Sequence, residues 1–243
     1  MRDMTHSAKT DTARLWAVLC FVTAIAFAIV PFASDPFSGF DPDRFPIPVD
    51  NPPIQPVGWA FSIWGVIYLW LIIGTGFGLI KRSDAPDWAP HRPWAFASLI
   101  VGAAWIPIAL ISPIWATILI LVMLVTALIA LAKAPMADHG FARWPLGLYA
   151  GWLTAASAVS LATLAAGYGL ASAQVTSWIA LPIAVLVAAY ITLRLWTPTY
   201  PAAAAWAAMG IAVANWPSGF AWGAATGATL LAALVSLAIV RRF

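Results

Sequence analysis

Long apolar stretches separated by short polar ones set the pattern of this chain. Their lengths and the charged residues that bound them predict eight helices that cross a lipid bilayer. They run over residues 13–33, 57–80, 93–111, 113–133, 145–167, 175–195, 201–216 and 219–240. The seventh is the weakest, since a short helix rising about 1.5 Å per residue barely crosses a core of about 30 Å. We therefore expect an all-α integral membrane protein, a bundle of about eight transmembrane helices.

The placement of the basic residues supports eight helices. With both termini cytoplasmic and the helices alternating, eleven of the twelve basic residues fall on the cytoplasmic side, as the positive-inside rule requires. They are Arg2, Lys9, Arg14, Lys81, Arg82, Arg92, Lys133, Arg143, Arg194, Arg241 and Arg242, and only Arg44 falls outside. Seven helices would move the C-terminal arginines outside. The pattern favours a plasma-membrane-type bilayer, which in a bacterium is the inner membrane.

Charge is scarce, and its absence from the helices excludes several functions. Hydrophobic residues make up 63% of the chain and charged residues 9%, where a soluble domain carries about 25%. The spans hold no ionisable residue near their centres, and His6, His91 and His139 lie in the terminal tail or cytoplasmic loops. Proton relays, voltage sensors and coupled transporters need such residues. No catalytic motif, metal-ligand cluster or required cofactor is indicated, and nothing points to nucleic acid.

A connecting segment of residues 34–56 is predicted on the outer side. It holds seven prolines and four aspartates against a single basic residue, Arg44. It reads either as a solvated connector or as a lid over the mouth of the bundle, because long ordered loops are often functional.

Aromatic residues gather where this loop enters the second helix. Pro52, Pro53 and Pro56 fix φ and keep the preceding residues out of the helical region, so no helix starts before residue 57. The aromatic residues that follow are predicted to form a pocket wall: Trp59, Phe61, Trp64 and Tyr68. The last two are four residues apart and share one helix face.

Other tryptophans lie too deep for an interfacial belt to explain them. These are Trp64, Trp70, Trp105, Trp152 and Trp206. For Trp70 and Trp206 we expect core packing, and for the other three a role in a pocket.

Small residues indicate close helix packing. Gly219, Gly223 and Gly227 form a doubled Gly-xxx-Gly ridge on the last helix. Either this ridge packs within the chain, or it forms the interface of a homodimer or a larger membrane complex.

Three motifs resemble the tryptophan-rich sensory protein family (TspO/MBR, the translocator proteins). Trp64-Gly65-Val66-Ile67-Tyr68, preceded by Asn51-Pro52-Pro53 and Trp59, resembles the second-helix signature of that family. Trp105-Ile106-Pro107 resembles the Trp-x-Pro of its third helix, and residues 149–156, from Tyr149 through Trp152 to Ala156, resemble its fifth-helix stretch. The resemblance implies a five-helix unit over residues 1–167, with the outer loop 34–56, followed by three additional helices over 168–243.

The resemblance also implies a pocket among the first five helices for a flat hydrophobic ligand, a porphyrin or another tetrapyrrole, with a carotenoid or lipid as further possibilities. Aromatic faces stack on conjugated rings at about 0.5–1.5 kcal/mol per pair. The expected ligand-binding residues are Trp59, Phe61, Trp64, Tyr68, Gly102, Trp105, Pro107, Tyr149, Trp152 and Ala156.

Four functions stay open at this point. The first is a non-catalytic sensor or regulator that binds such a ligand, with membrane lipids around it. The second is an accessory subunit of a pigment-containing, photosynthetic membrane complex. The third is a facilitator for hydrophobic metabolites, and the fourth is an enzyme of light-dependent porphyrin breakdown.

Overall fold

The computed structural model describes residues 2–35, 37 and 39–241, with side chains from Asp11 onward. Eight α-helices account for most of these residues. They are α1 (Arg2–Ile29), α2 (Ile63–Lys81), α3 (Arg92–Ala109), α4 (Pro113–Lys133), α5 (Arg143–Gly167), α6 (Ala173–Leu195), α7 (Thr199–Ala214) and α8 (Gly219–Val240). Short 3-10 turns occupy Val30–Ala33, Pro42–Arg44 and Gly58–Ser62. The described part of the chain is all-α, so the predicted fold class is confirmed.

Seven of the helices are long and apolar enough to cross a membrane, and α7 is the exception. At 16 residues it measures about 24 Å, shorter than a bilayer core of about 30 Å. Much of its surface is nevertheless buried by its neighbours. The weakest apolar segment is therefore an internal helix that needs little contact with lipid.

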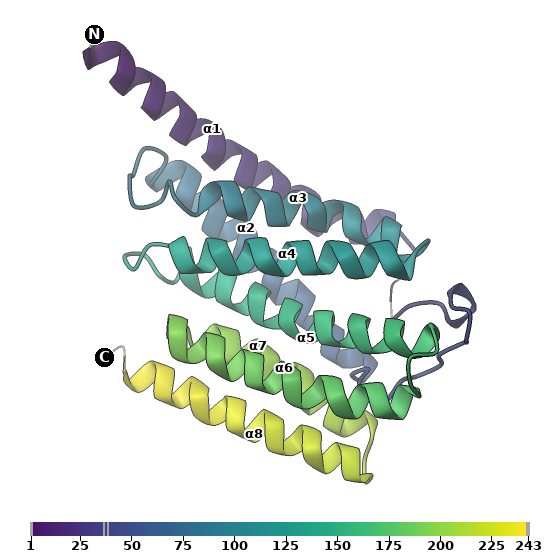
Figure 1. Cartoon of the computed structure of the whole chain (residues 1–243). Helices are drawn as coiled ribbons and strands as arrows, with labels where there is room; N and C mark the ends of the chain where they lie inside the picture. The colour runs from purple at the N-terminus through teal and green to yellow at the C-terminus, as the bar shows by residue number, and fades with distance from the viewer. Residues whose placement is uncertain (1, 36, 38, 242–243) are drawn as a thin grey trace.

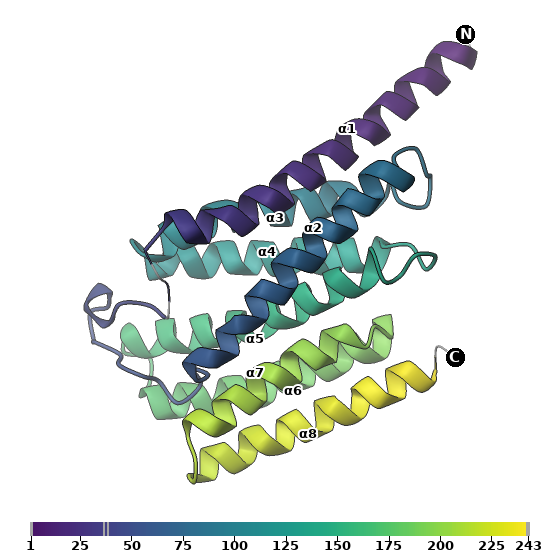
Figure 2. The ribbon, with the colours of Figure 1, turned by 180° about the vertical axis from the view of Figure 1, so that it is seen from behind.

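The first five helices close into a ring. α1 packs on α2 and α3, α3 packs on α4, α4 packs on α5, and α5 returns to α2. The contact between α2 and α5 is the smallest in this ring, and Figure 2 shows α2 crossing α5 obliquely. The ring is consequently least tightly closed between these two helices.

The last three helices cover α5 on the outside of the ring. α6 and α7 both pack on α5, and α8 packs on α7 and α6 (Figure 1). Gly151 of α5 makes the closest approach, since an added Cβ would collide with the backbone oxygen of Tyr200. Glycine thus allows the α5 and α7 backbones to touch.

Both chain ends lie at one end of the bundle, and the loop before α2 lies at the other (Figures 1 and 2). The first turns of α1 project beyond the bundle. The predicted basic ends of the helices therefore gather on one side, although Arg242 lies outside the described residues.

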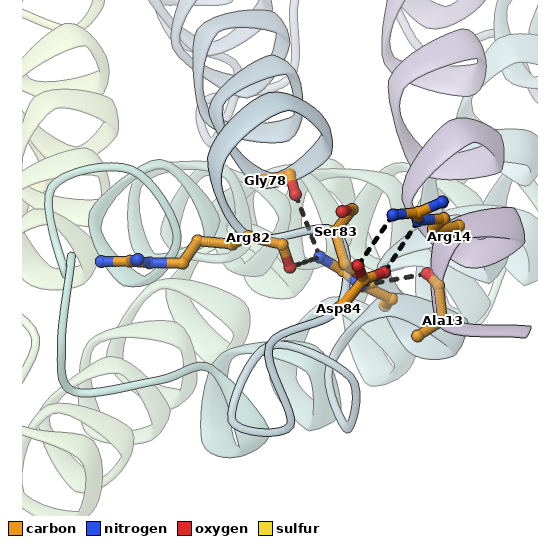
Figure 3. Close-up of polar contacts among 7 residues, drawn as sticks. Ala13, Arg14, Gly78, Arg82, Ser83 and Asp84 are labelled. Atoms are coloured by element: carbon orange, nitrogen blue, oxygen red, sulfur yellow. Dashed lines mark hydrogen bonds and ion pairs between the residues drawn. The ribbon is translucent and has the colours of Figure 1, made fainter. Parts of the chain in front are cut away.

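Two buried arginines fasten the basic end. Arg92 donates to the backbone oxygens of Ala13, Gly78, Arg82 and Ser83, at 2.6 to 3.1 Å. Figure 3 shows these acceptors beside the ion pair of Arg14 with Asp84, whose Nε–Oδ1 distance is 3.0 Å. The Arg92 guanidinium thereby joins α1, the end of α2 and the start of α3.

Arg143 acts in the same way at the start of α5. It donates to the backbone oxygens of Leu131, Ala134 and Leu195 and to the Thr197 hydroxyl. Charged donors make stronger hydrogen bonds than neutral ones. Three helices and two loops are thus tied to one side chain.

His91 differs from the sequence prediction in its surroundings. It lies in the loop before α3, as expected, but is only 6% exposed. Burial, and then the neighbouring Arg92 charge, lower its pKa to about 3. His91, directly before α3, is therefore part of the core at the basic end.

The glycine ridge of α8 packs mainly inside the chain. A Cβ at Gly223 would lie 3.4 Å from Trp178, and one at Gly227 would lie 2.9 Å from Val185, both on α6. Gly219 has open space around it. Two of the three glycines therefore serve the α6–α8 contact.

Candidate ligand-binding site

A cavity of about 340 Å³ lies inside the bundle, in the half nearest the outer loop. Its walls come from all of the ring helices except α1, together with the 3-10 turn after α1, the outer loop and α7. The lining residues are Pro31, Phe37, Gly39, Phe40, Gln55, Pro56, Phe61, Trp64, Tyr68, Trp105, Ile106, Ile120, Trp152, Ala155, Ala156, Val159, Ser160, Thr163, Ala207 and Ile211.

Helix α5 supplies the longest wall. Its lining residues recur at helical spacing, from Trp152 through Ala155, Ala156, Val159 and Ser160 to Thr163. A single large residue at one end is followed by small ones. This change in side-chain volume along one helix face leaves the space that the cavity occupies.

Helix α2 places two aromatic rings against α5. Trp64 stacks on Tyr68 with centroids 5.2 Å apart and an angle of 19° between the ring planes. Trp152 meets Trp64 edge to face at 6.2 Å. Phe61 meets Trp152 in the same way at 5.8 Å. These mutual contacts hold the rings in fixed orientations.

Trp105 forms the opposite wall and is held by its own hydrogen bond. Its indole Nε1 donates to the backbone oxygen of Ala116 on α4, at 2.8 Å. The polar atom of the ring is therefore satisfied within the protein. The apolar body of Trp105 remains available to a ligand, since the residue lines the cavity.

The outer loop forms the roof. Phe37 meets Trp105 edge to face at 5.0 Å and Phe40 at 5.7 Å. Gly39 lies between them with φ of 140°, a backbone conformation that side chains with a Cβ rarely adopt. The loop is thus more than a solvated connector, because its phenylalanines cover the cavity.

The loop is also fastened to the end of α5. The Ile47 amide donates to the backbone oxygen of Gly167 at 3.0 Å. Phe45 is buried against Gly167, where a Cβ would leave it no room. The roof is therefore attached at its far side, while Phe37 and Phe40 cover the cavity through aromatic contacts.

The cavity suits an apolar ligand that carries few polar groups. Its described lining residues include no charged side chain, and Gln55, Tyr68, Ser160 and Thr163 supply the polar contacts apart from the indoles. Within the described residues there is no group of three side chains suited to hold a metal ion. A mostly apolar cavity with a few polar groups is typical of small-molecule sites, which range from about 300 to 1,000 Å³.

Six of the ten residues predicted from the sequence line this one cavity. They are Phe61, Trp64, Tyr68, Trp105, Trp152 and Ala156. The three deep tryptophans singled out for a pocket therefore face a common space.

The other four lie outside the lining. Trp59 is 44% exposed and packs on Trp206, and Pro107 faces outward on α3. Gly102 gives room to Phe27, whose ring would lie 2.8 Å from an added Cβ. Tyr149 is fully buried and shares a hydrogen bond with Ser98 at 3.0 Å.

Trp70 and Trp206 serve packing, as expected. The Trp70 indole donates to the backbone oxygen of Gly140, and the Trp206 indole donates to that of Ala60, both at 2.8 Å. Neither residue lines the cavity.

The lining residues that sequence reasoning missed include three instructive pairs. Val159 and Thr163 continue the helical spacing of Trp152 and Ala156, so extending that pattern would have found them. The roof residues Phe37 and Phe40 carry no periodic signal. Ala207 and Ile211 lie on α7, which the five-helix interpretation placed outside the pocket unit.

Comparison with known proteins gives one match. A family model described as TSPO-like protein matches residues 48–241, from the outer loop into the end of α8. Neither the curated proteins nor the solved structures yield a match. The matched range includes the three helices that follow α5.

Proposed function

The chain belongs to the TSPO-like protein family, and on that basis we propose that it is a non-catalytic membrane sensor or regulator that binds a flat hydrophobic ligand. The observation that carries this proposal is the cavity that Trp64, Trp105 and Trp152 line together. Tetrapyrroles are the ligand class that we favour, since each aromatic contact with a conjugated ring adds about 0.5–1.5 kcal/mol.

The cavity volume bears on how such a ligand enters. At about 340 Å³ it is at the lower end of the range for small-molecule sites. A porphyrin macrocycle therefore needs the roof to rise, whereas a smaller ring system fits beneath it. Phe37 and Phe40 are the roof residues that would move, because aromatic contacts hold them over the cavity.

Titration with protoporphyrin IX in detergent tests the proposal. Binding is followed by the change in the porphyrin Soret band, because removing an indole alters protein fluorescence by itself. We expect saturable binding, weakened several-fold by Trp105→Ala or Trp152→Ala through loss of aromatic contact. Trp222→Ala is the matched control, since Trp222 is 58% exposed and lies outside the cavity lining. Folded variants that bind like the parent chain would refute the site.

An accessory role in a pigment-containing membrane complex is the second candidate. The open surface at Gly219 favours it, although Gly223 and Gly227 are occupied by α6. Purification from the native membrane in a mild detergent distinguishes the two roles. A stable partner that co-purifies supports the accessory role, and a chain that migrates alone counts against it.

Location in the bacterial inner membrane with both termini cytoplasmic is part of the proposal. It rests on the basic residues at the helix ends that share a side with the termini. A green fluorescent protein fused to the C-terminus should fluoresce, and an alkaline phosphatase fused there should be inactive.

A further inference from the structure

Helix α7 contributes to the cavity in a way that the five-helix ring alone does not explain. Ala207 and Ile211 line it, are one turn apart and are almost completely buried. α7 packs on α5 and on the 3-10 turn Gly58–Ser62 that leads into α2, so it lies on the side of the ring where α2 and α5 meet. The cavity therefore extends past the ring at its least tightly closed point, and α7 closes it there.

The geometry of α5 and α7 explains this extension. Their backbones touch at Gly151, where Ala203 and Tyr200 are the nearest neighbours. One and two turns further on, Ala155 and Val159 of α5 line the cavity, and so do Ala207 and Ile211 of α7. The two helices thus touch at Gly151, and one and two turns further on both of them line the cavity.

A thin partition separates this side from a second, smaller void. A cavity of about 30 Å³ lies between α5, α6, α7 and α8. Ala155, Ala207 and Ile211 line both spaces. These three residues therefore border both the main cavity and the void behind it.

Helix α7 also holds the segment of residues 53–60 that leads into α2, here called the entrance segment. The Trp206 indole donates to the backbone oxygen of Ala60, and the Val57 amide donates to that of Gly210 at 3.2 Å. The Asn215 side chain donates to the backbone oxygen of Pro53 at 2.7 Å. The same helix thus supplies a wall and anchors the proline-rich segment beside it.

From these contacts we infer that α7 limits the width of the ligand that the cavity accepts, and that Ala207 and Ile211 are the specificity-determining residues. This inference rests on the proposed binding function. The ligand class is a flat apolar ring system whose edge projects out of the five-helix ring, between α2 and α5. A narrower ring system reaches only the indoles and does not contact α7.

Substitutions that fill or widen this side test the inference. Ala207→Leu should weaken the binding of protoporphyrin IX about tenfold, because the added carbon atoms overfill a packed site. It should leave the narrower fluorophore 1-aminoanthracene within about twofold. Ile211→Ala should strengthen protoporphyrin binding by joining the two spaces. Ala202→Leu is the matched control, because Ala202 lies on α7 but lines an open groove on another side.

A labelling experiment keeps the test independent of the porphyrin and of folding defects. In a Cys20→Ala background, Ala207→Cys, at a position that lines the cavity, should react with N-ethylmaleimide, whereas Ala203→Cys, which packs against Gly151 outside the cavity lining, should not. An unreactive Ala207→Cys, or a folded Ala207→Leu that binds both compounds like the parent chain, would overturn the inference. Failure of the parent chain to bind protoporphyrin would refute the proposed function, and the labelling result would still decide whether α7 borders the cavity.

Discussion

Side chains at the outer end and at the basic end of this bundle have different roles. At the outer end the residues that line the cavity are mostly aromatic, small or aliphatic, and their shapes define an apolar space. At the basic end Arg92 and Arg143 are buried with their hydrogen bonds made to backbone oxygens of several helices. A buried charge needs such partners, since an unsatisfied one is costly. The hydrogen bonds at the basic end therefore hold the helices together, and the apolar residues at the outer end can line a ligand site.

His91 gives the basic end a dependence on pH. Its pKa falls to about 3 in the folded chain, because burial and Arg92 disfavour the charged form. An unfolded histidine titrates near 6.5. Between these values the unfolded chain binds a proton that the folded chain does not, so stability is complete above about pH 6.5 and falls as the pH falls.

Thermal unfolding in detergent between pH 7.5 and 4.5 measures this effect. We expect the midpoint to fall with pH in the parent chain and to fall less in His91→Gln. His139→Gln, which replaces a histidine in the loop between α4 and α5, is the control. Asp138 affects the stability of the folded chain only at lower pH. The hydrogen bond from Arg82 lowers the pKa of the Asp138 carboxyl, so the stability that it contributes is lost as the pH falls below the ordinary aspartate range. Equal slopes for His91→Gln and the parent would show that His91 does not carry the effect.

For single residues, the sequence predicted the deep tryptophans of the cavity wall correctly but not the position of every aromatic residue near them. Trp64, Trp105 and Trp152 share the cavity, as their depth in the helices and the family resemblance suggested. Trp59 does not, because the 3-10 turn Gly58–Ser62 precedes α2 and Trp59 instead packs on Trp206. A partner on α7 cannot be inferred from local spacing.

The lengths of the apolar segments predicted the bounds of most helices well. The segments 113–133 and 219–240 coincide with α4 and α8. The first helix was predicted from residue 13 but begins at Arg2, since its polar first turns carry no apolar pattern. The order of helices around the ring was beyond prediction from the motifs alone, because contacts between distant helices leave no periodic signal.

Arg92 is the contact that most directly joins the elements at the basic end. Arg92→Lys keeps the charge but cannot reproduce a planar fork that donates to four backbone oxygens. We expect a lower unfolding temperature by circular dichroism, since each unsatisfied buried acceptor costs about 1–3 kcal/mol.

Arg194→Lys is the matched control for this substitution. Arg194 also lies at a helix end, but its Nε hydrogen bond goes to the exposed Tyr190 hydroxyl at 3.3 Å. Its replacement should change stability little. If both variants unfold with the parent chain, the Arg92 contacts do not hold the helices together.

In the whole molecule, the three C-terminal helices and the ring share one core. α7 packs on α5, lines the cavity and anchors the entrance segment. The family match also runs across the predicted division at residues 167 and 168. The division into a five-helix unit and three additional helices remains a prediction from the sequence resemblance. It can be tested by separating α7 from α5 and measuring whether the ligand site is damaged.

Gly151→Leu makes that separation in the intact chain. A side chain at Gly151 meets the backbone oxygen of Tyr200, so α7 must move away from α5 at a cost of about 1–3 kcal/mol. Gly65→Leu is the control, since Gly65 lies on α2 with open space around it and gains about 1 kcal/mol in helix propensity. We expect Gly151→Leu alone to lower both the unfolding temperature and the affinity for protoporphyrin IX. A destabilised variant with parental affinity would mean that the ring forms the ligand site without α7.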